Sequence, residues 1–117
     1  MALKAGMVTI DCADPRGLAT FWTEAVGYEV AVDYGVFMVL QGDGIPLGLQ
    51  QVPEPRNGKN RVHIDWRTDD RESEIKRLVG LGATVLDEQE VPGLRWTVLA
   101  DPEGNEFCVL GRRADTP

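Results

Sequence analysis

The sequence predicts an α+β fold of two tandem βαβββ modules within a single domain of 117 residues. A β-like stretch, a helix-like stretch and three short β-rich stretches occur twice in that order. The stretch "VTIDCAD" at residues 8–14 aligns with "VHIDWRTD" at 62–69. We therefore expect module one over about residues 6–52, a polar linker with Pro and Gly, "PEPRNGKN", over 53–60, and module two over about 61–111.

Module one opens with alternating residues 7–12, which predict a strand, and continues with a helical pattern. Asp14 is a natural N-cap, Pro15 suits the first helical turn, and Gly27 suits a left-handed stop. The apolar positions that share one helical face are Leu18, Phe21, Trp22 and Ala25. Three short β-rich runs between residues 28 and 52, separated by Gly, Asp and Pro, predict an antiparallel meander.

Module two repeats this order. Residues 61–67 predict a strand, and residues 69–82 predict an amphipathic helix. The helix residues expected to face inward are Ile75, Leu78 and Val79. Residues 83–91, 94–100 and 105–110 predict the remaining three strands.

The only histidine of the chain, His63, is expected to point into a groove. A βαβββ module has one sheet face covered by its helix and the other bare, so two bare faces can curl toward a shared concavity. Strand alternation places Val62, Ile64 and Trp66 on one face and His63, Asp65 and Arg67 on the other. The apolar set should lie under the helix, so His63 and its counterpart Thr9 face the groove.

Four stretches give the chain a resemblance to the vicinal oxygen chelate superfamily, which contains glyoxalase I, bleomycin-resistance proteins and extradiol dioxygenases. They are "VTIDCADP", "VHIDWRTDD", "LVGLGATVL" and "TVLADPEGNEFCVL". The resemblance covers nearly the whole chain and is more specific for fold than for reaction. It implies that the two modules form a half-open barrel and that the protein is a homodimer.

The resemblance further implies a divalent metal held by one residue from the first and one from the last strand of each module. In module two these positions are His63 and Glu106. In module one they are Thr9 and, depending on register, Gly48 or Gln50. Module one therefore offers neither a histidine nor a carboxylate where the metal-dependent pattern has them.

Imidazole and carboxylate together suit one divalent Ni, Co, Zn, Mn or Fe ion. The alternative is a pocket without any cofactor, in which His63 and Glu106 act as a hydrogen-bonded acid/base pair. A chain with one histidine lacks the two that the iron triad of dioxygenases needs, which disfavours that chemistry. Glu106 shares its strand face with Cys108 and Leu110, although a glutamate after a turn is also often simply solvated.

The further ligand-binding candidates are Thr9, Gln50, Trp96 and Phe37. Trp96 either lines the groove or packs beneath the helix, because strand alternation alone does not decide between these two faces. Asp11 and Asp65 occupy the same place in both modules, which favours a role in the module fold. Cys12 and Cys108 match no metal-binding spacing and lie among apolar residues, so we expect buried, reduced thiols.

The net charge of −7 argues against nucleic-acid and membrane partners, whose phosphates need a basic face. The start of the chain lacks a secretory signal pattern, which favours a cytoplasmic protein. Three alternatives remain. The first is a glyoxalase-like lyase or isomerase that acts on a small oxygen-rich substrate through His63 and Glu106. The second is a noncatalytic drug-binding protein of the bleomycin-resistance type without metal, and the third is a protein whose modules serve only as an oligomeric scaffold.

Overall fold

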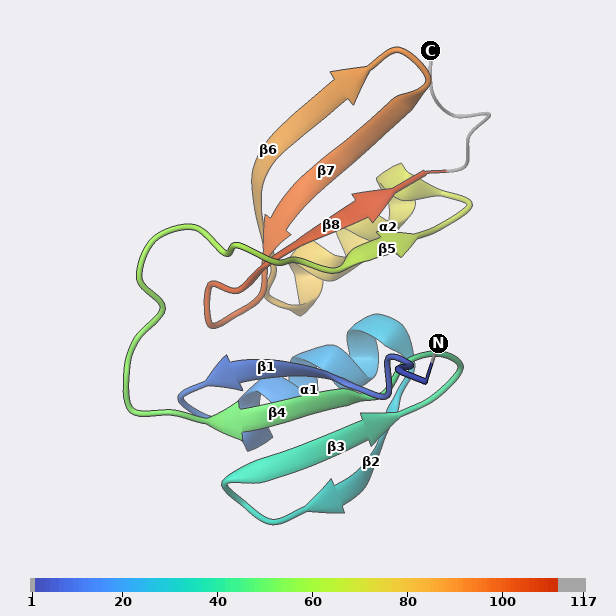
Figure 1. Ribbon diagram of the computed structural model, residues 1–117. Helices are drawn as coiled ribbons and strands as arrows, with labels where there is room; N and C mark the ends of the chain where they lie inside the picture. Colours follow the sequence, from blue (N-terminus) through green and yellow to red (C-terminus); the bar gives the residue numbers. More distant parts are fainter. Residues whose placement is uncertain (1, 112–117) are drawn as a thin grey trace. The chain divides into compact units, whose positions relative to one another are not determined.

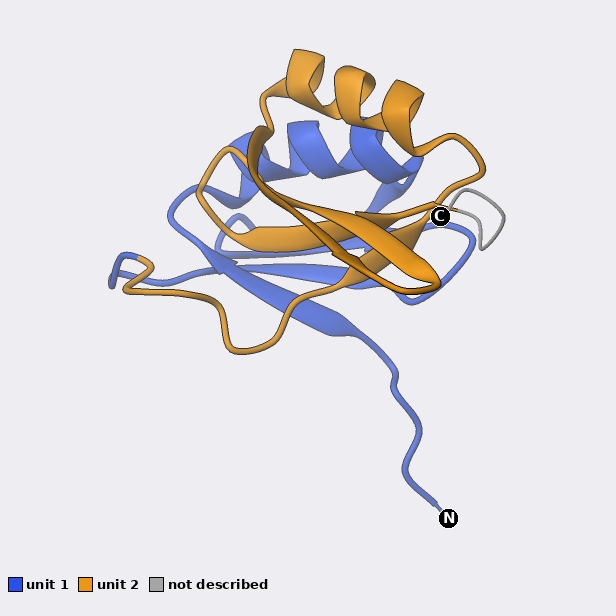
Figure 2. Ribbon diagram, turned by 90° about the horizontal axis from the view of Figure 1, so that it is seen from above, with its two compact units in different colours: residues 1–55 blue, residues 56–117 orange. Residues whose placement is uncertain are grey.

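The computed structural model describes residues 2–111 and confirms the predicted α+β fold, in which each of two modules contains a four-stranded mixed sheet and one helix (Figure 1). The chain divides into two compact units, one ending at Pro55 and the other beginning at Arg56 (Figure 2). Each unit holds one module. No helix in residues 2–111 is long and apolar enough to span a membrane.

The first unit contains one parallel and two antiparallel strand pairs. Its elements are β1 (Val8–Cys12), α1 (Pro15–Val26), β2 (Glu29–Asp33), β3 (Phe37–Gln41) and β4 (Leu47–Gln51). The sheet order is β1-β4-β3-β2, so the first strand of the module pairs with its last. That parallel pairing is what a βαβββ module needs to bring its two ends together.

Helix α1 has the boundaries and the buried face that its sequence predicts. The Asp14 side chain accepts a hydrogen bond from the Gly17 amide, and Gly27 closes the helix with a φ of 71°. Leu18, Phe21, Trp22 and Ala25 are all buried. The helix packs on β3 and β4, whose Met38, Leu40, Leu47 and Leu49 are also buried. Thr9, Phe37 and the other alternate residues of these strands lie on the opposite face of this sheet.

The second unit repeats the topology with the order β5-β8-β7-β6. Its elements are β5 (Asp65–Arg67), α2 (Arg71–Leu81), β6 (Thr84–Val91), β7 (Leu94–Ala100) and β8 (Glu106–Leu110). His63 precedes β5 by two residues instead of lying within the strand. The backbone nevertheless continues the pairing there, because the Cys108 amide donates to the Ile64 carbonyl over 2.9 Å.

Two apolar residues of this unit are more exposed than the sequence predicts. Leu78 is buried as expected, but Val79 is 47% exposed and Val62 is 82% exposed. Val62 lies in the bend before β5, where strand alternation does not yet apply. The prediction that Val62 and Val79 lie in the core was therefore wrong, and helix α2 covers its sheet with a narrower apolar stripe than α1 does.

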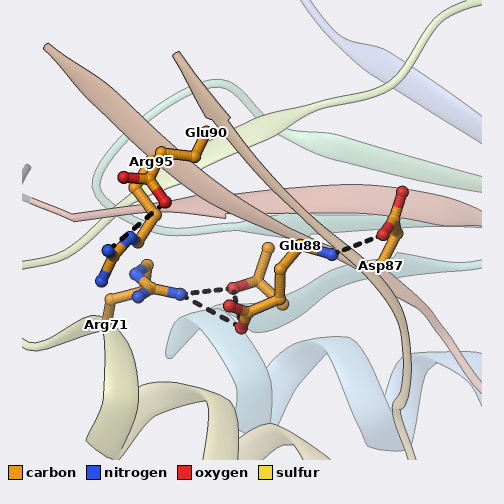
Figure 3. A network of polar contacts seen from close by, with 6 residues as sticks. Arg71, Asp87, Glu88, Glu90 and Arg95 are labelled. Carbon is orange, nitrogen blue, oxygen red and sulfur yellow. Dashed lines mark hydrogen bonds and ion pairs between the residues drawn. The ribbon is translucent and has the colours of Figure 1, made fainter. Parts of the chain in front are cut away.

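A polar network anchors the start of α2 to the sheet (Figure 3). Arg71 Nη1 donates to Thr97 Oγ1 over 2.6 Å and contacts Glu88 Oε1 at 3.4 Å, and the Thr97 hydroxyl donates to Glu88 over 3.1 Å. Thr97 is fully buried, so its hydroxyl needs such partners. The network ties the first residue of α2 to β6 and β7, while the helix packs on β8.

We expect Asp14→Ala to lower the free energy of unfolding by about 1 kcal/mol, because the Gly17 amide loses its acceptor. Asp14→Ser keeps a side-chain oxygen at the cap and should retain most of the stability. Urea unfolding of the three proteins measures the difference. Equal losses in the two variants would contradict a capping role.

Candidate functional site

The open sheet face of the second unit forms a concavity of about 870 Å³. Its walls come from the linker segment 56–59, from His63 and from strands β5, β6, β7 and β8. All of its lining residues belong to the second unit. The size lies within the range of small-molecule sites in proteins.

Strand register determines which side chains line this concavity. Asp65 lies opposite Cys108 in the parallel β5/β8 pair, and Cys108 lies opposite Val98 in the antiparallel β8/β7 pair. Because side chains directly opposite one another share a face, these three form a row across the sheet. Alternation then adds Glu106 and Leu110 to the same face of β8.

Three potential metal ligands converge on the floor of the concavity. His63 Nδ1 lies 3.3 Å from Asp65 Oδ1 and 3.6 Å from Cys108 Sγ. One ligand atom from each residue lies within 4.8 Å of the others. An imidazole, a carboxylate and a thiolate form a donor set suited to borderline divalent ions, so this group can hold a metal ion.

The Cys108 thiol is unreactive as a free group. Burial raises the pKa of Cys108 to about 11, and the negative charges of Asp65 and Glu106 add to the effect, while Lys59 opposes it. The thiol is therefore protonated at neutral pH. A Cys108 nucleophile activated by His63 finds no support, because a reactive cysteine needs a lowered pKa.

Glu106 lines the same concavity as His63 but is held by the linker. Its side chain is only 10% exposed, so Glu106 is not a solvent-exposed glutamate of the kind that often follows a turn. Glu106 Oε2 lies 3.3 Å from Arg56 Nη1 and accepts a hydrogen bond from the Asn60 amide over 3.4 Å. The groups in contact with the His63 ring are Asp65 and Cys108.

The first unit has no comparable donor set at the positions that the resemblance implies. Register places Thr9 opposite Gly48 and Asp11 opposite Gln50, so Gly48, not Gln50, is the partner of Thr9. A Cβ at position 48 would lie 2.7 Å from Thr9 Oγ1 and 3.1 Å from the Phe37 ring. Thr9, Gln50 and Phe37 share one face of this sheet, where they are neighbours.

Residues 7–110 match the protein family described as the glyoxalase-like domain. The chain belongs to this family. The match covers most of the chain and confirms the resemblance to the vicinal oxygen chelate superfamily. A comparison with curated proteins found no significant match to this glyoxalase-like protein.

Solved structures show the same fold at low sequence identity. A glyoxalase/bleomycin resistance protein/dioxygenase family enzyme from Burkholderia phytofirmans PsJN has a TM-score of 0.80 and 18% identity, covering 93% of this chain and 98% of that one. Lactoylglutathione lyase from Agrobacterium tumefaciens gives 0.71 and 18%, covering 97% and 96%. The bleomycin-binding protein of Streptomyces verticillus, solved with copper(II)-bleomycin, gives 0.68 and 14%, covering 95% and 98%.

Two residues at the centre of the candidate site were not identified as possible ligands from the sequence. Asp65 was assigned to the module fold because Asp11 shares its place, yet Asp65 is 51% exposed beside the His63 ring. Cys108 was expected as a buried thiol, and it is both buried and in contact with His63. Strand alternation already carried the signal. It places Asp65 on the same sheet face as His63, and Cys108 on the same face as Glu106.

Trp96 lines the concavity and does not pack beneath the helix, a choice that strand alternation alone did not decide. It lies opposite Leu110 in β8 and opposite Gln89 in β6. The alternate residues of β7, Thr97 and Leu99, are fully buried on the helix-covered face. Trp96 thus forms part of the wall of this concavity.

We expect Arg56→Met to destabilise the protein by about 1–3 kcal/mol, because it leaves a nearly buried Glu106 carboxylate without its cation. Glu106→Gln removes the charge, so the double variant Arg56→Met/Glu106→Gln should lose less than the sum of the single losses. Urea unfolding of the four proteins gives the coupling. Additive losses would show that the ion pair contributes nothing to stability.

Proposed function

We propose that this glyoxalase-like protein is a metal-assisted lyase or isomerase that binds a small oxygen-rich substrate in the concavity of the second unit. The observation that carries the proposal is the convergence of His63, Asp65 and Cys108 on one point of a pocket that also holds Glu106. A shared fold alone does not define a reaction, so the site residues have to support it.

His63, Asp65 and Cys108 are the residues that would hold the metal. Three protein ligands with one open position are typical of catalytic zinc sites, and a thiolate among them favours Zn or Co over Mn. When bound, the ion would polarise substrate oxygens as a Lewis acid. A second histidine is missing from the sequence, which keeps dioxygenase chemistry disfavoured.

Glu106 is the residue that we assign to proton transfer. Its contacts with Arg56 and the Asn60 amide both engage Oε2, so Oε1 is the oxygen assigned to exchange a proton with the substrate. Lyases and isomerases of this kind must move a proton next to a carbon–oxygen bond, and a fixed carboxylate in a pocket suits this task. In this proposal, Arg56 positions Glu106.

A metal-free binding protein is the second candidate. The observation that favours it is the missing donor pair in the first unit, where Thr9 lies opposite Gly48. One solved structure of the same fold is a bleomycin-binding protein. In this case the concavity would hold a drug-sized molecule without chemistry. Thr9, Gln50 and Phe37, which share one sheet face of the first unit, would form a contact surface of their own.

The metal site can be tested by cobalt titration of the metal-free, untagged protein. We expect a near-ultraviolet absorption band from cobalt–thiolate coordination, which Cys108→Ser abolishes. Cys12→Ser is the matched control, because Cys12 is the other buried free cysteine and lies in the first unit. His63→Ala and Asp65→Asn should weaken binding by at least about tenfold, a loss that outer-shell partners alone can cause.

Glu106→Gln separates the two roles of that carboxylate. If Glu106 transfers protons, the variant retains cobalt but loses turnover. If the variant loses cobalt as fully as His63→Ala does, Glu106 is a ligand and the assignment above is wrong. Absence of any cobalt band in the parent protein, together with a rise in melting temperature caused by metal-free bleomycin, would favour the binding protein.

We further propose that the protein is a homodimer, as its superfamily resemblance implies. Light scattering combined with size-exclusion chromatography measures the mass directly. A single peak at the 12.9 kDa mass of one chain would contradict the dimer.

A further inference from the structure

The linker between the two modules contains the pair Asn57–Gly58, which no step of the proposed function uses. Residues 53–60 belong to no helix or strand, and both members of the pair are exposed. Gly58 has a φ of 78°, a conformation that suits glycine in a turn. Because glycine has no β-carbon, nothing on Gly58 hinders the approach of its backbone nitrogen to the Asn57 side-chain amide.

The contacts of the linker leave the two reacting groups of this pair free. Arg56 Nη1 donates to the Gly58 carbonyl and to Glu106 Oε2, and the Asn60 amide also donates to Glu106 Oε2. Within residues 2–111, no hydrogen bond engages the Asn57 side chain or the Gly58 N–H. The two groups can therefore approach each other without breaking a contact.

The other asparagines of the chain, Asn60 and Asn105, are more constrained. Asn60 is half-buried, and its backbone amide is bonded to Glu106. The Asn105 backbone amide donates to Asp101 Oδ1 over 3.0 Å, and its carbonyl accepts from the Asp101 amide over 2.8 Å. The residues that follow them, Arg61 and Glu106, carry side chains that hinder their backbone nitrogens.

We propose that Asn57 is a site of deamidation whose products weaken the ion pair between Arg56 and Glu106. The Gly58 nitrogen attacks the side-chain carbonyl carbon of Asn57 and forms a C–N bond. The bond from that carbon to Nδ2 breaks, and ammonia leaves with the Gly58 amide proton. Water then opens the cyclic imide at either of its carbonyls and yields aspartate or isoaspartate. The reaction consumes water, releases ammonia and needs no oxidant or reductant.

Both products act on the cation that holds Glu106. Each carries a new carboxylate on the residue next to Arg56, where it competes with Glu106 for the guanidinium. Isoaspartate also inserts a carbon into the backbone just before Gly58, whose carbonyl Arg56 binds. The Glu106 side chain is only 10% exposed, so a weaker pair leaves a nearly buried charge poorly compensated. Deamidation of the linker thus acts on a wall of the concavity, with or without a metal or ligand.

Incubation of the full-length protein in warm, mildly alkaline buffer tests the site. The product carries an additional negative charge, so ion-exchange chromatography separates it and peptide mass spectrometry locates it. Asn57 should deamidate at least about tenfold faster than Asn60 and Asn105, since a barrier difference of one hydrogen bond already gives roughly that factor.

Two variants and a peptide identify the cause. Gly58→Ala should slow the reaction at Asn57 because a β-carbon hinders the nitrogen, and this β-carbon would meet no atom within 4 Å. Asn57→Gln should slow it because glutamine has to form a larger ring. A synthetic peptide of residues 53–61 should deamidate within about threefold of the folded protein, as expected where local opening costs almost no free energy.

The effect on the ion pair is measured with Asn57→Asp, which reproduces one of the two products. Urea unfolding of the parent, Arg56→Met, Glu106→Gln and the double variant gives the coupling between the two side chains. This coupling should fall when Asn57→Asp is added to all four proteins. Asn57→Gln, which adds no charge, is the matched control and should leave the coupling unchanged.

Equal deamidation of all three asparagines, or a folded protein that reacts much more slowly than the peptide, would overturn the assignment of the site. A coupling that Asn57→Asp does not change, or that is absent from the parent, would overturn the effect on the ion pair. Neither result depends on the cobalt titration, so this inference and the metal-assisted function can fail separately.

Discussion

The parallel pairing of the β5 segment with β8 is the constraint on which the candidate site depends. The hydrogen bond from the Cys108 amide to the Ile64 carbonyl extends this pairing to the residue next to His63. Residues 45 positions apart in the chain, His63 and Cys108, thereby come into contact. Without this backbone register, the imidazole would belong to a bend of the linker and would have no fixed neighbours.

The two faces of the second sheet divide structural and chemical tasks. The helix-covered face is closed by Leu99, Phe107 and the buried Thr97, which Arg71 binds from the first turn of α2. The other face is left open, and its polar side chains are held by one another or by the linker, as in the Arg56–Glu106 pair. A rigid scaffold beneath an open face is the arrangement in which a site can be held in place without being buried.

The fold could be predicted from the sequence because each element carries its own local signal. Asp14, Gly27 and the buried stripe of α1 lie where capping and periodicity place them. The prediction for Val62 was wrong because this residue lies in the bend before β5, and the prediction for Val79 was wrong because α2 buries only a narrow apolar stripe. Helix and strand patterns are reliable within elements and weak at their ends.

The site was predicted only in part. Strand alternation correctly placed Glu106, Cys108 and Leu110 on one face, and all three line the concavity. Two features needed three-dimensional coordinates. One is the ion pair between linker residue Arg56 and Glu106, which are 50 positions apart. The other is the contact between Asp65 and His63. No local pattern encodes which of several groove-facing carboxylates lies beside the imidazole.

The glycine at position 48 has a consequence for how the two modules could have diverged. A Cβ there would crowd the Thr9 hydroxyl and the Phe37 ring, so an acidic residue at this position requires these side chains to move. The Thr9 hydroxyl would have to rotate away, because it would lie only 2.7 Å from that Cβ. A new carboxylate donor in the first module would therefore need a rearrangement of its neighbours, whereas the second module already presents its carboxylates beside the histidine.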